Sequence, residues 1–215
     1  MKKILLIAFL ASFISNAQEK ETNRIEISPF IGVSSSNYYG NIKLENNKNL
    51  TAPIFGVDGD FFINDRWSIK AGFECQTLGS KVYVEEFVEY PAGNYYYEYY
   101  YAKEKLKFIS IPLHANLHFG RLKNWNFNFG PTVGFILSGS FNGEKFDNDI
   151  LRKEQFGLGI GIGYRFEIDE EFSFGIDYQE YIGLTSNLNS TFMYPKPFIG
   201  NISGNFNLRL IYKLQ

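Results

Sequence analysis

The sequence has few of the residues that build cross-links or metal centres. Its 215 residues include one cysteine, Cys75, and two histidines, and the net charge is −2. A single thiol cannot form an internal disulfide, and nucleic-acid binding would need a basic face that this composition does not suggest. We therefore predict no cofactor and no nucleic-acid partner.

Long apolar runs are also scarce, apart from one at the start of the chain. Lys2 and Lys3 precede the apolar stretch Ile4–Ile14, and small residues lead to Ala17. This pattern predicts a cleaved secretory signal peptide over residues 1–17 and an exported domain over residues 18–215. No later stretch approaches the ~18 unbroken apolar residues that a membrane-spanning helix needs.

The abundant residues are phenylalanine, tyrosine and glycine, with 22, 15 and 20 copies. They alternate most clearly in Phe156–Tyr178, FGLGIGIGYRFEIDEEFSFGIDY, where every second residue is large and apolar. A period of two predicts strands, and Asp169-Glu170-Glu171 interrupts it as a tight turn would. One face of this hairpin is apolar and aromatic, whereas the other consists of glycine and charged residues.

The same alternation predicts eight strands over most of the chain. Their ranges are 24–34, 53–63, 67–78, 104–119, 125–137, 156–167, 172–178 and 201–214. The connections alternate between long and short, which is typical of outer-membrane barrels with short periplasmic turns and long extracellular loops. We predict an all-β fold, an eight-stranded antiparallel up-and-down transmembrane β-barrel. It would be a monomer in the bacterial outer membrane, surrounded by lipid and lipopolysaccharide, with both termini in the periplasm.

A soluble lipocalin-like barrel would also alternate, but with its large apolar residues pointing inward. Aromatic residues beside the short turns favour the membrane barrel, where they would form an interfacial girdle. These residues are Trp67, Phe119, Trp125, Phe166 and Phe172. Prolines cannot donate to a ladder, and Pro112 and Pro131 lie almost equally far from the turn at residues 120–124. We hypothesise that these two prolines share a β-bulge.

Several segments together resemble the PorT-like outer-membrane β-barrel proteins of bacteria that glide or use type IX secretion. These segments are GVDGDFFINDRWSIKAGFECQTLGSK (56–81), LKFISIPLHANLHFG (106–120), NFGPTVGFILSG (128–139), FGLGIGIGYRFE and DYQEYIGLTSN. The resemblance covers most of the exported domain and implies a small barrel. It implies little about activity, because members range from secretion-system components to proteins with no assigned role. The chain departs from the family by ending in Tyr212-Lys213-Leu214-Gln215, where members usually end on an aromatic residue.

Charged residues are predicted to line the barrel interior. They are Glu26, Asp58, Asp60, Lys70, Glu74, Arg165, Glu167, Asp177 and Arg209. An eight-stranded barrel is narrow enough to be filled by its own side chains. A network of paired charges is therefore favoured over a conducting path, which stays as the alternative.

Catalysis has a weaker basis. Ser110, His114 and His118 share one strand face, but residues four apart in a strand are separated by ~13 Å and cannot meet at one centre. We predict that they line the lumen, that no residue is catalytic or binds a metal or cofactor, and that the protein is not an enzyme. A lipid-modifying enzyme is the least favoured alternative.

The most informative loop lies between the third and fourth strands. Its alternation continues outward, which predicts a protruding hairpin with a turn near Pro91–Asn94. Its candidate partner-binding residues are Tyr90, Tyr95, Tyr96, Tyr97, Tyr99, Tyr100 and Tyr101. Tyrosine is common on contact surfaces, but cross-strand tyrosine pairs could equally stiffen the hairpin. Lys103, Lys105 and Lys107 are expected at the outer rim, near lipopolysaccharide phosphates.

Two functions follow from these features. The first is a non-enzymatic membrane anchor or docking component, with a protein partner in a secretion or surface assembly. The alternative is a surface adhesin or ligand binder that acts through the tyrosine-rich hairpin of residues 79–103.

Overall fold

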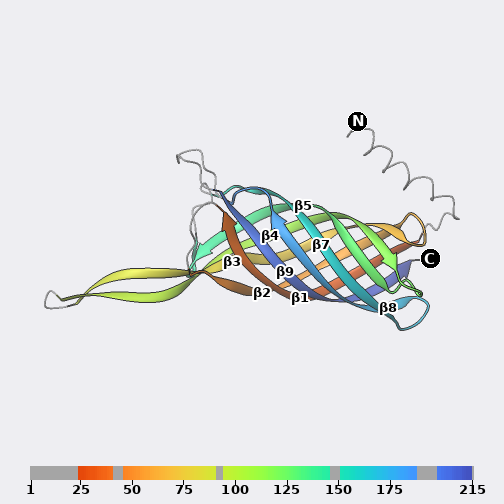
Figure 1. Ribbon diagram of the computed structural model, residues 1–215, viewed down its shortest axis with the longest axis horizontal. Helices are drawn as coiled ribbons and strands as arrows, with labels where there is room; N and C mark the ends of the chain where they lie inside the picture. The colour runs from red at the N-terminus through yellow and green to blue at the C-terminus, as the bar shows by residue number, and fades with distance from the viewer. Residues whose placement is uncertain (1–23, 41–45, 91–93, 146–150, 188–197, 215) are drawn as a thin grey trace, which may run out of the picture.

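The computed structural model describes residues 24–40, 46–90, 94–145, 151–187 and 198–214; the expected signal peptide lies outside these ranges. The chain folds as long tilted antiparallel strands around one axis (Figure 1). The strands are β1 (Ile25–Gly40), β2 (Lys48–Phe62), β3 (Trp67–Tyr90), β4 (Asn94–Phe119), β5 (Trp125–Phe141), β6 (Glu144–Lys145), β7 (Glu154–Glu167), β8 (Phe172–Gly183) and β9 (Ile199–Leu214). In the described part of the chain, no helix is long and apolar enough to cross a bilayer.

The eight long strands form a closed barrel. Neighbours pair in the order β4-β3-β2-β1-β9-β8-β7-β5, and β4 also pairs with β5, which closes the circle. The remaining strand, β6, has two residues and pairs only with the end of β5. The predicted eight-stranded barrel is confirmed, with β6 as an addition in the connection between the strands expected over residues 125–137 and 156–167.

The two faces of the wall have the polarity of a membrane barrel. Outward residues such as Ile31, Phe73 and Leu113 are 63%, 60% and 54% exposed. Inward residues such as Glu26, Asn116 and Asn207 are fully buried. Apolar side chains thus cover the outside and polar side chains such as these face the inside, which contradicts the lipocalin-like alternative.

Most strands are longer at their long-loop ends than the alternation predicted. β1 continues from residue 34 to Gly40, β2 begins five residues before Pro53, and β8 extends to Gly183 into the expected loop. The added residues are more polar on their outward side, so hydrophobic alternation fades there. Ladder hydrogen bonds do not need an apolar face, and the strands therefore continue past the apolar band.

The aromatic girdle beside the short turns is confirmed. Phe119 stacks on Trp125 at 6.3 Å, Trp125 meets Tyr164 at 4.9 Å, and Phe172 meets Tyr212 at 5.0 Å between ring centroids. The predicted proline bulge is wrong. Pro112 pairs with Thr132 in the same register as Ala115 with Phe129, and the register shift lies instead between Lys107 and Phe108. Neighbouring residues therefore carry the ladder past the prolines without an insertion.

Inward glycines of β7 make room for side chains from neighbouring strands. A Cβ on Gly159 would lie 2.6 Å from His114 Cε1, and one on Gly161 would lie 2.7 Å from Gln179 Cγ. On Gly163 it would lie 2.4 Å from Asn126 Oδ1. The apolar–glycine alternation of this strand thus reflects a lumen filled from the other strands.

Candidate functional site

Paired charges cross the lumen in its half nearer the short turns. Arg209 of β9 contacts both Asp177 of β8 and Asp58 of β2, and Lys70 Nζ lies 3.8 Å from the same Asp58 carboxylate. Arg209 and Asp58 are at most 4% exposed. A buried guanidinium between two carboxylates satisfies charges that would be costly alone. The predicted charge network is confirmed here.

A second pair lies near the short-turn end of the barrel. Arg165 of β7 binds both oxygens of Glu26, with Nη1 2.9 Å from Oε1. Arg24 Nε lies 3.2 Å from the same carboxylate. Glu167 departs from the prediction: it is exposed at the last position of β7 rather than buried in the lumen. Because Glu167 is at the end of its strand, its side chain reaches solvent at the mouth of the barrel instead of the lumen.

The two histidines bind polar neighbours from other strands. His114 Nδ1 lies 3.0 Å from Asn128 Oδ1, and its Nε2 lies 3.1 Å from Thr132 Oγ1. This ring is 3% exposed, and both of its nitrogens are satisfied. Ser110 accepts a 3.1 Å hydrogen bond from Gln76 and does not contact His114 in the described contacts. These residues line the lumen as predicted.

His118 belongs to a cluster that sequence spacing could not show. Ser68 Oγ lies 3.0 Å from His118 Nε2 and donates to Asp60 Oδ1 at 2.8 Å. The serine therefore lies between the acid and the imidazole, whereas a hydrolytic triad places histidine in the middle. All three are at most 5% exposed. No group of acidic, histidine or cysteine side chains within the described ranges could hold a metal ion.

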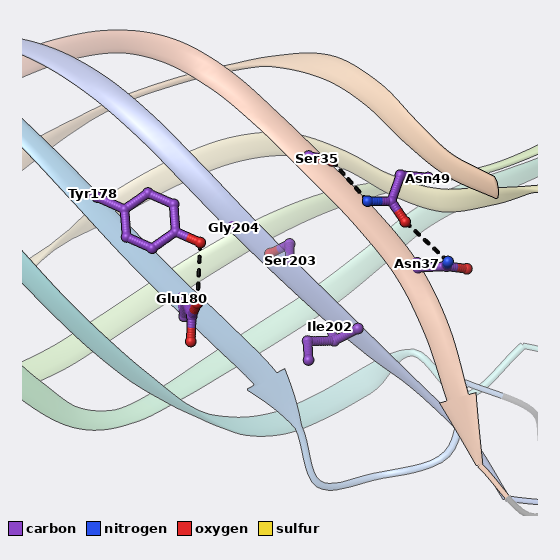
Figure 2. Close-up of a pocket in the computed structure, with 8 residues that line it drawn as sticks. All are labelled: Ser35, Asn37, Asn49, Tyr178, Glu180, Ile202, Ser203 and Gly204. Carbon is purple, nitrogen blue, oxygen red and sulfur yellow. Dashed lines mark hydrogen bonds between the residues drawn. The ribbon is translucent and has the colours of Figure 1, made fainter.

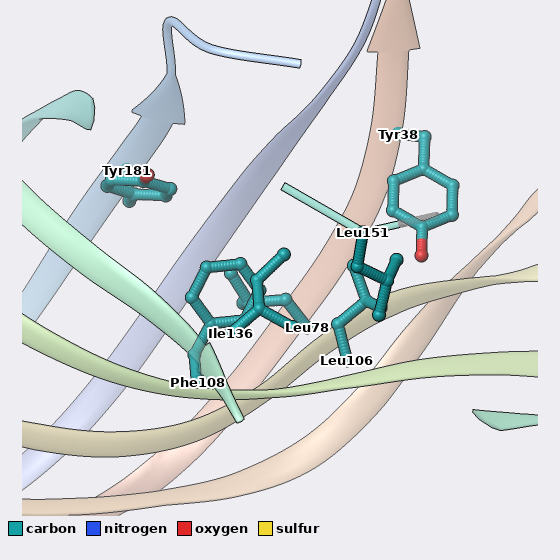
Figure 3. Close-up of a cluster of buried hydrophobic side chains, with 7 residues drawn as sticks. All are labelled: Tyr38, Leu78, Leu106, Phe108, Ile136, Leu151 and Tyr181. Carbon is teal, nitrogen blue, oxygen red and sulfur yellow. The ribbon is translucent and has the colours of Figure 1, made fainter. Parts of the chain in front are cut away.

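The long-loop half of the lumen is filled differently, by an apolar cluster (Figure 3). Its members come from five long strands and from the segment before β7: Tyr38, Leu78, Leu106, Phe108, Ile136, Leu151 and Tyr181. Leu78 and Leu106 are at most 1% exposed. We call this cluster the apolar plug. The sequence analysis missed this cluster. Leu78 and Leu106 nevertheless lie an even number of residues from inward polar residues of the same strands, Gln76 and Ser110, and so share their side of the wall.

The β3–β4 hairpin continues beyond the barrel at the end opposite the C-terminus (Figure 1). In β3, the last residue that pairs with β2 is Lys81. In β4, the residues that pair with β5 lie between Glu104 and Phe119. Residues 82–90 and 94–103 therefore pair only with each other in the described ladders. We call this part the ribbon. Its existence and its position were predicted, and the structure confirms both.

The ribbon divides the predicted tyrosines between two faces. Tyr97, Tyr99 and Tyr101 face the same side, opposite Phe87, Glu85 and Tyr83 in the register. Tyr96 and Tyr100 face the other side, opposite Val88 and Val84. The remaining two, Tyr90 and Tyr95, pair with Asn94 and Glu89 near the tip, and their side chains lie outside the described part.

Aromatic rings on the first side contact one another across the strands. Tyr83 stacks on Tyr99 at 5.9 Å and meets Tyr101 edge-on at 5.4 Å, and Phe87 meets Tyr97 at 5.3 Å. Phe87, Tyr97 and Tyr99 are nevertheless 56%, 56% and 54% exposed. We call this side the aromatic face. The rings both stiffen the ribbon and remain available for contact.

Two tyrosines of the ribbon, Tyr99 and Tyr100, have raised pKa values beside its acidic residues. Partial burial raises the pKa of Tyr99, and the Glu85 carboxylate, which accepts its hydroxyl at 3.3 Å, adds to this effect. A hydrogen bond to the Glu86 carboxylate raises the pKa of Tyr100. Hydroxyls that stay protonated can donate hydrogen bonds to a partner.

A groove of about 300 Å³ lies on the barrel wall across β8, β9, β1 and β2 (Figure 2). Asn49 bridges Ser35 and Asn37 through hydrogen bonds of 3.2 and 3.0 Å, and Tyr178 donates to Glu180 at 3.0 Å. These five polar side chains thus pair within the groove, whereas the Ser203 hydroxyl is buried without a partner in the described contacts. We call it the Glu180 groove, and it provides no constellation for catalysis.

Fold, wall polarity and girdle together define a small outer-membrane barrel. Residues 16–189 match the model of the outer membrane protein β-barrel domain, and the chain belongs to that family. No curated protein matches the chain in sequence. The protein resides in the bacterial outer membrane.

Solved structures that share the fold include two small outer-membrane proteins. Neisserial surface protein A (NspA) is 12% identical with a TM-score of 0.51, over 91% of this chain and 100% of that one. Outer membrane protein OprG from Pseudomonas aeruginosa is 11% identical with a TM-score of 0.50, over 92% and 99%. At these identities the likeness concerns the fold alone.

Proposed function

We propose that the protein is a non-enzymatic membrane anchor whose ribbon docks a protein partner outside the cell. The observation that carries this proposal is the ribbon itself. It stands beyond the rim, presents an exposed aromatic face, and leaves the outer edges of both strands unpaired in the described ladders. Tyrosine surfaces of this kind bind with little loss of side-chain entropy.

The unpaired edges favour a protein over a glycan. An isolated two-stranded ribbon is marginally stable, and its edges present rows of free N–H and C=O groups. An extended segment of another protein satisfies such groups by adding a strand. The aromatic face would then supply pockets for alternate side chains of that segment.

The barrel interior supports an anchoring role rather than transport or catalysis. Charge pairs fill one half of the lumen and the apolar plug fills the other. The polar clusters bury their serine and histidines instead of presenting them to a substrate. Within its family we assign the chain to the PorT-like group, on the motifs around Ile111-Pro112-Leu113 and Gly183-Leu184-Thr185. Because some members of that group are secretion-system components, we propose a secretion or surface assembly as its setting.

Deletion of Glu86–Tyr99 tests the proposal. The full protein carries a tag in an extracellular loop, is cross-linked on intact cells and is purified in mild detergent. We expect a stoichiometric protein that accompanies the wild type and is lost on deletion, while the deleted barrel still shows heat-modifiable migration. A partner that stays with the deleted barrel would refute docking through the ribbon. Retention of a glycan but of no protein would refute the protein partner.

The matched control compares the two faces of the ribbon. Tyr97→Ser with Tyr99→Ser removes two rings from the aromatic face, whereas Tyr96→Ser with Tyr100→Ser removes two from the other face. We expect the first pair to weaken capture of the partner about tenfold or more, as loss of interfacial aromatic anchors commonly does. Equal effects of the two pairs would contradict the assignment of the aromatic face.

A further inference from the structure

A second groove, of about 240 Å³, lies on the outer wall across β2, β3, β4 and β5. Its polar lining consists of Thr51, Thr77, Lys105, Lys107, Ser138 and Ser140. Both lysines are exposed. We call this the basic groove. It lies at the long-loop end of the apolar band, next to the base of the ribbon on the barrel wall.

Register shifts build the basic groove on both of its sides. Between Lys107 and Phe108 the pairing with β5 slips by one residue. Beyond the slip, Ser138 and Ser140 stand opposite Lys107 and Lys105 and share their outward face. A second shift interrupts β2 between Asn49 and Ile54. Bulges re-aim side chains, and here the shift after Lys107 sets two serines opposite two lysines on the outward face.

More positive charge lies next to the groove. Lys48 is opposite Lys81, and Lys81 is opposite Lys103, so three neighbouring strands place three lysines side by side. Lys48 Nζ also lies 4.1 Å from the centre of the Tyr101 ring. Like charges directly opposite each other destabilise a sheet. Among the described residues, the ion pairs involve other cations, namely Arg24, Lys70, Lys123, Arg165 and Arg209.

On the side of the lysines nearer the short turns, the outer wall is apolar. Phe55, Phe135 and Leu137 are 55%, 39% and 56% exposed on the same strands that line the groove. An anion with acyl chains would thus meet cations and hydroxyls with its head and apolar side chains with its tails. The Glu180 groove, which spans β8, β9, β1 and β2, contains a carboxylate and no lysine.

We propose that the basic groove binds a phosphate of an outer-leaflet glycolipid, with the acyl chains along Phe55, Phe135 and Leu137. Lys105 and Lys107 supply charge-assisted hydrogen bonds, and Ser138 and Ser140 donate through their hydroxyls. The lipid would offset the repulsion among the clustered lysines. The site is independent of the ribbon's docking role.

Native mass spectrometry of the purified full barrel in detergent tests this site. The probes are diphosphorylated lipid A, the same lipid without phosphate, and inorganic phosphate. We expect lipid A to bind the wild type, and Lys105→Gln with Lys107→Gln to weaken binding about tenfold or more, since two charged contacts are lost. Lys105→Arg with Lys107→Arg should retain binding.

The control removes two positive charges from the same end of the protein but outside the groove. Arg152 and Lys153 are exposed before β7, and Arg152→Gln with Lys153→Gln should leave binding unchanged. The proposal would be overturned if the wild type bound lipid A equally well with and without phosphate. It would also be overturned if the Lys105→Gln, Lys107→Gln variant bound lipid A as tightly as the wild type. Equally tight binding of inorganic phosphate would make this a free-anion site instead.

Heat-modifiable migration confirms that each variant is folded. If the double lysine variant does not fold, Ser138→Ala with Ser140→Ala serves in its place. Loss of two hydroxyl hydrogen bonds to the phosphate should weaken lipid A binding about threefold or more. An unchanged affinity in that variant would also overturn the proposed site.

Discussion

The two halves of the β3–β4 hairpin are built from one continuous alternation but meet different surroundings. Within the barrel, both strands pair on both sides, and outward residues such as Phe73 and Leu113 face lipid. In the ribbon, the same strands pair only with each other among the described ladders, and outward residues such as Phe87 and Tyr97 face water. The change from leucine and phenylalanine to tyrosine and glutamate follows this boundary. Stability therefore resides in the barrel, and the proposed recognition resides in the ribbon.

The largest effect should come from the charge network of the barrel. Arg209→Met leaves the buried carboxylates of Asp58 and Asp177 without their shared cation. We expect a loss of about 3–5 kcal/mol in the free energy of unfolding, measured by urea titration in micelles. The exposed pair of Lys123 with Asp65 at the short turns is the control, and Lys123→Gln should cause no measurable change. Equal effects would mean that the network does not stabilise the barrel.

An intermediate effect should come from the inward glycines. Gly159→Ala would place a methyl group 2.6 Å from His114 Cε1, whereas on Gly59→Ala the nearest atom, Phe61 Cε2, lies at 3.4 Å. We expect Gly159→Ala to cost about 1–3 kcal/mol of unfolding free energy through overpacking. The alanine at position 59 should be nearly neutral in the same titration. A neutral Gly159→Ala would show that the lumen is less tightly filled than the contacts indicate.

Removal of the ribbon should have a smaller effect on barrel stability than either of these substitutions. Deletion of Glu86–Tyr99 removes residues that pair only with each other in the described ladders. The unfolding free energy of the barrel should change by no more than about 0.5 kcal/mol, as for surface changes distant from the core. A large loss of stability would mean that the ribbon supports the barrel, and would remove the separation between the two regions.

The smallest effect concerns pH. The pKa values of Tyr99 and Tyr100 are raised in the folded ribbon. These hydroxyls therefore stay protonated where unfolded tyrosines ionise, so their contribution to ribbon stability is complete below pH ~10 and declines above it. The absorbance of tyrosinate at alkaline pH should appear later in the wild type than in the urea-unfolded protein. Earlier ionisation would contradict the acidic surroundings of the aromatic face.

Alternation alone predicted the barrel, its closure and the protruding ribbon, because a period of two and the loop lengths constrain the topology strongly. It also predicted which charged residues lie inside, apart from Glu167 at a strand end. It did not give the register, and so it missed the contact of His118 with Ser68 and misplaced the bulge. Those features depend on which residues face each other across strands, and spacing within one strand does not contain that information.

The apolar plug could have been predicted in part. Extending the parity of Gln76 to Leu78, and of Ser110 back to Phe108 and Leu106, places apolar residues inside the barrel. The contribution of Leu151 could not have been predicted, because it comes from outside the long strands. The basic groove needed the register shifts as well, since only they turn Ser138 and Ser140 toward Lys107 and Lys105.

One measurement tests most directly whether the aromatic face is a docking surface. A photo-reactive phenylalanine analogue replaces Tyr97 on the ribbon or, as a control, Leu113 on the lipid-facing wall, and intact cells are irradiated. Both positions are more than half exposed, at 56% and 54%. The account predicts a discrete protein adduct from position 97 and none from position 113. No protein adduct at position 97, or the same adduct at both positions, would contradict it.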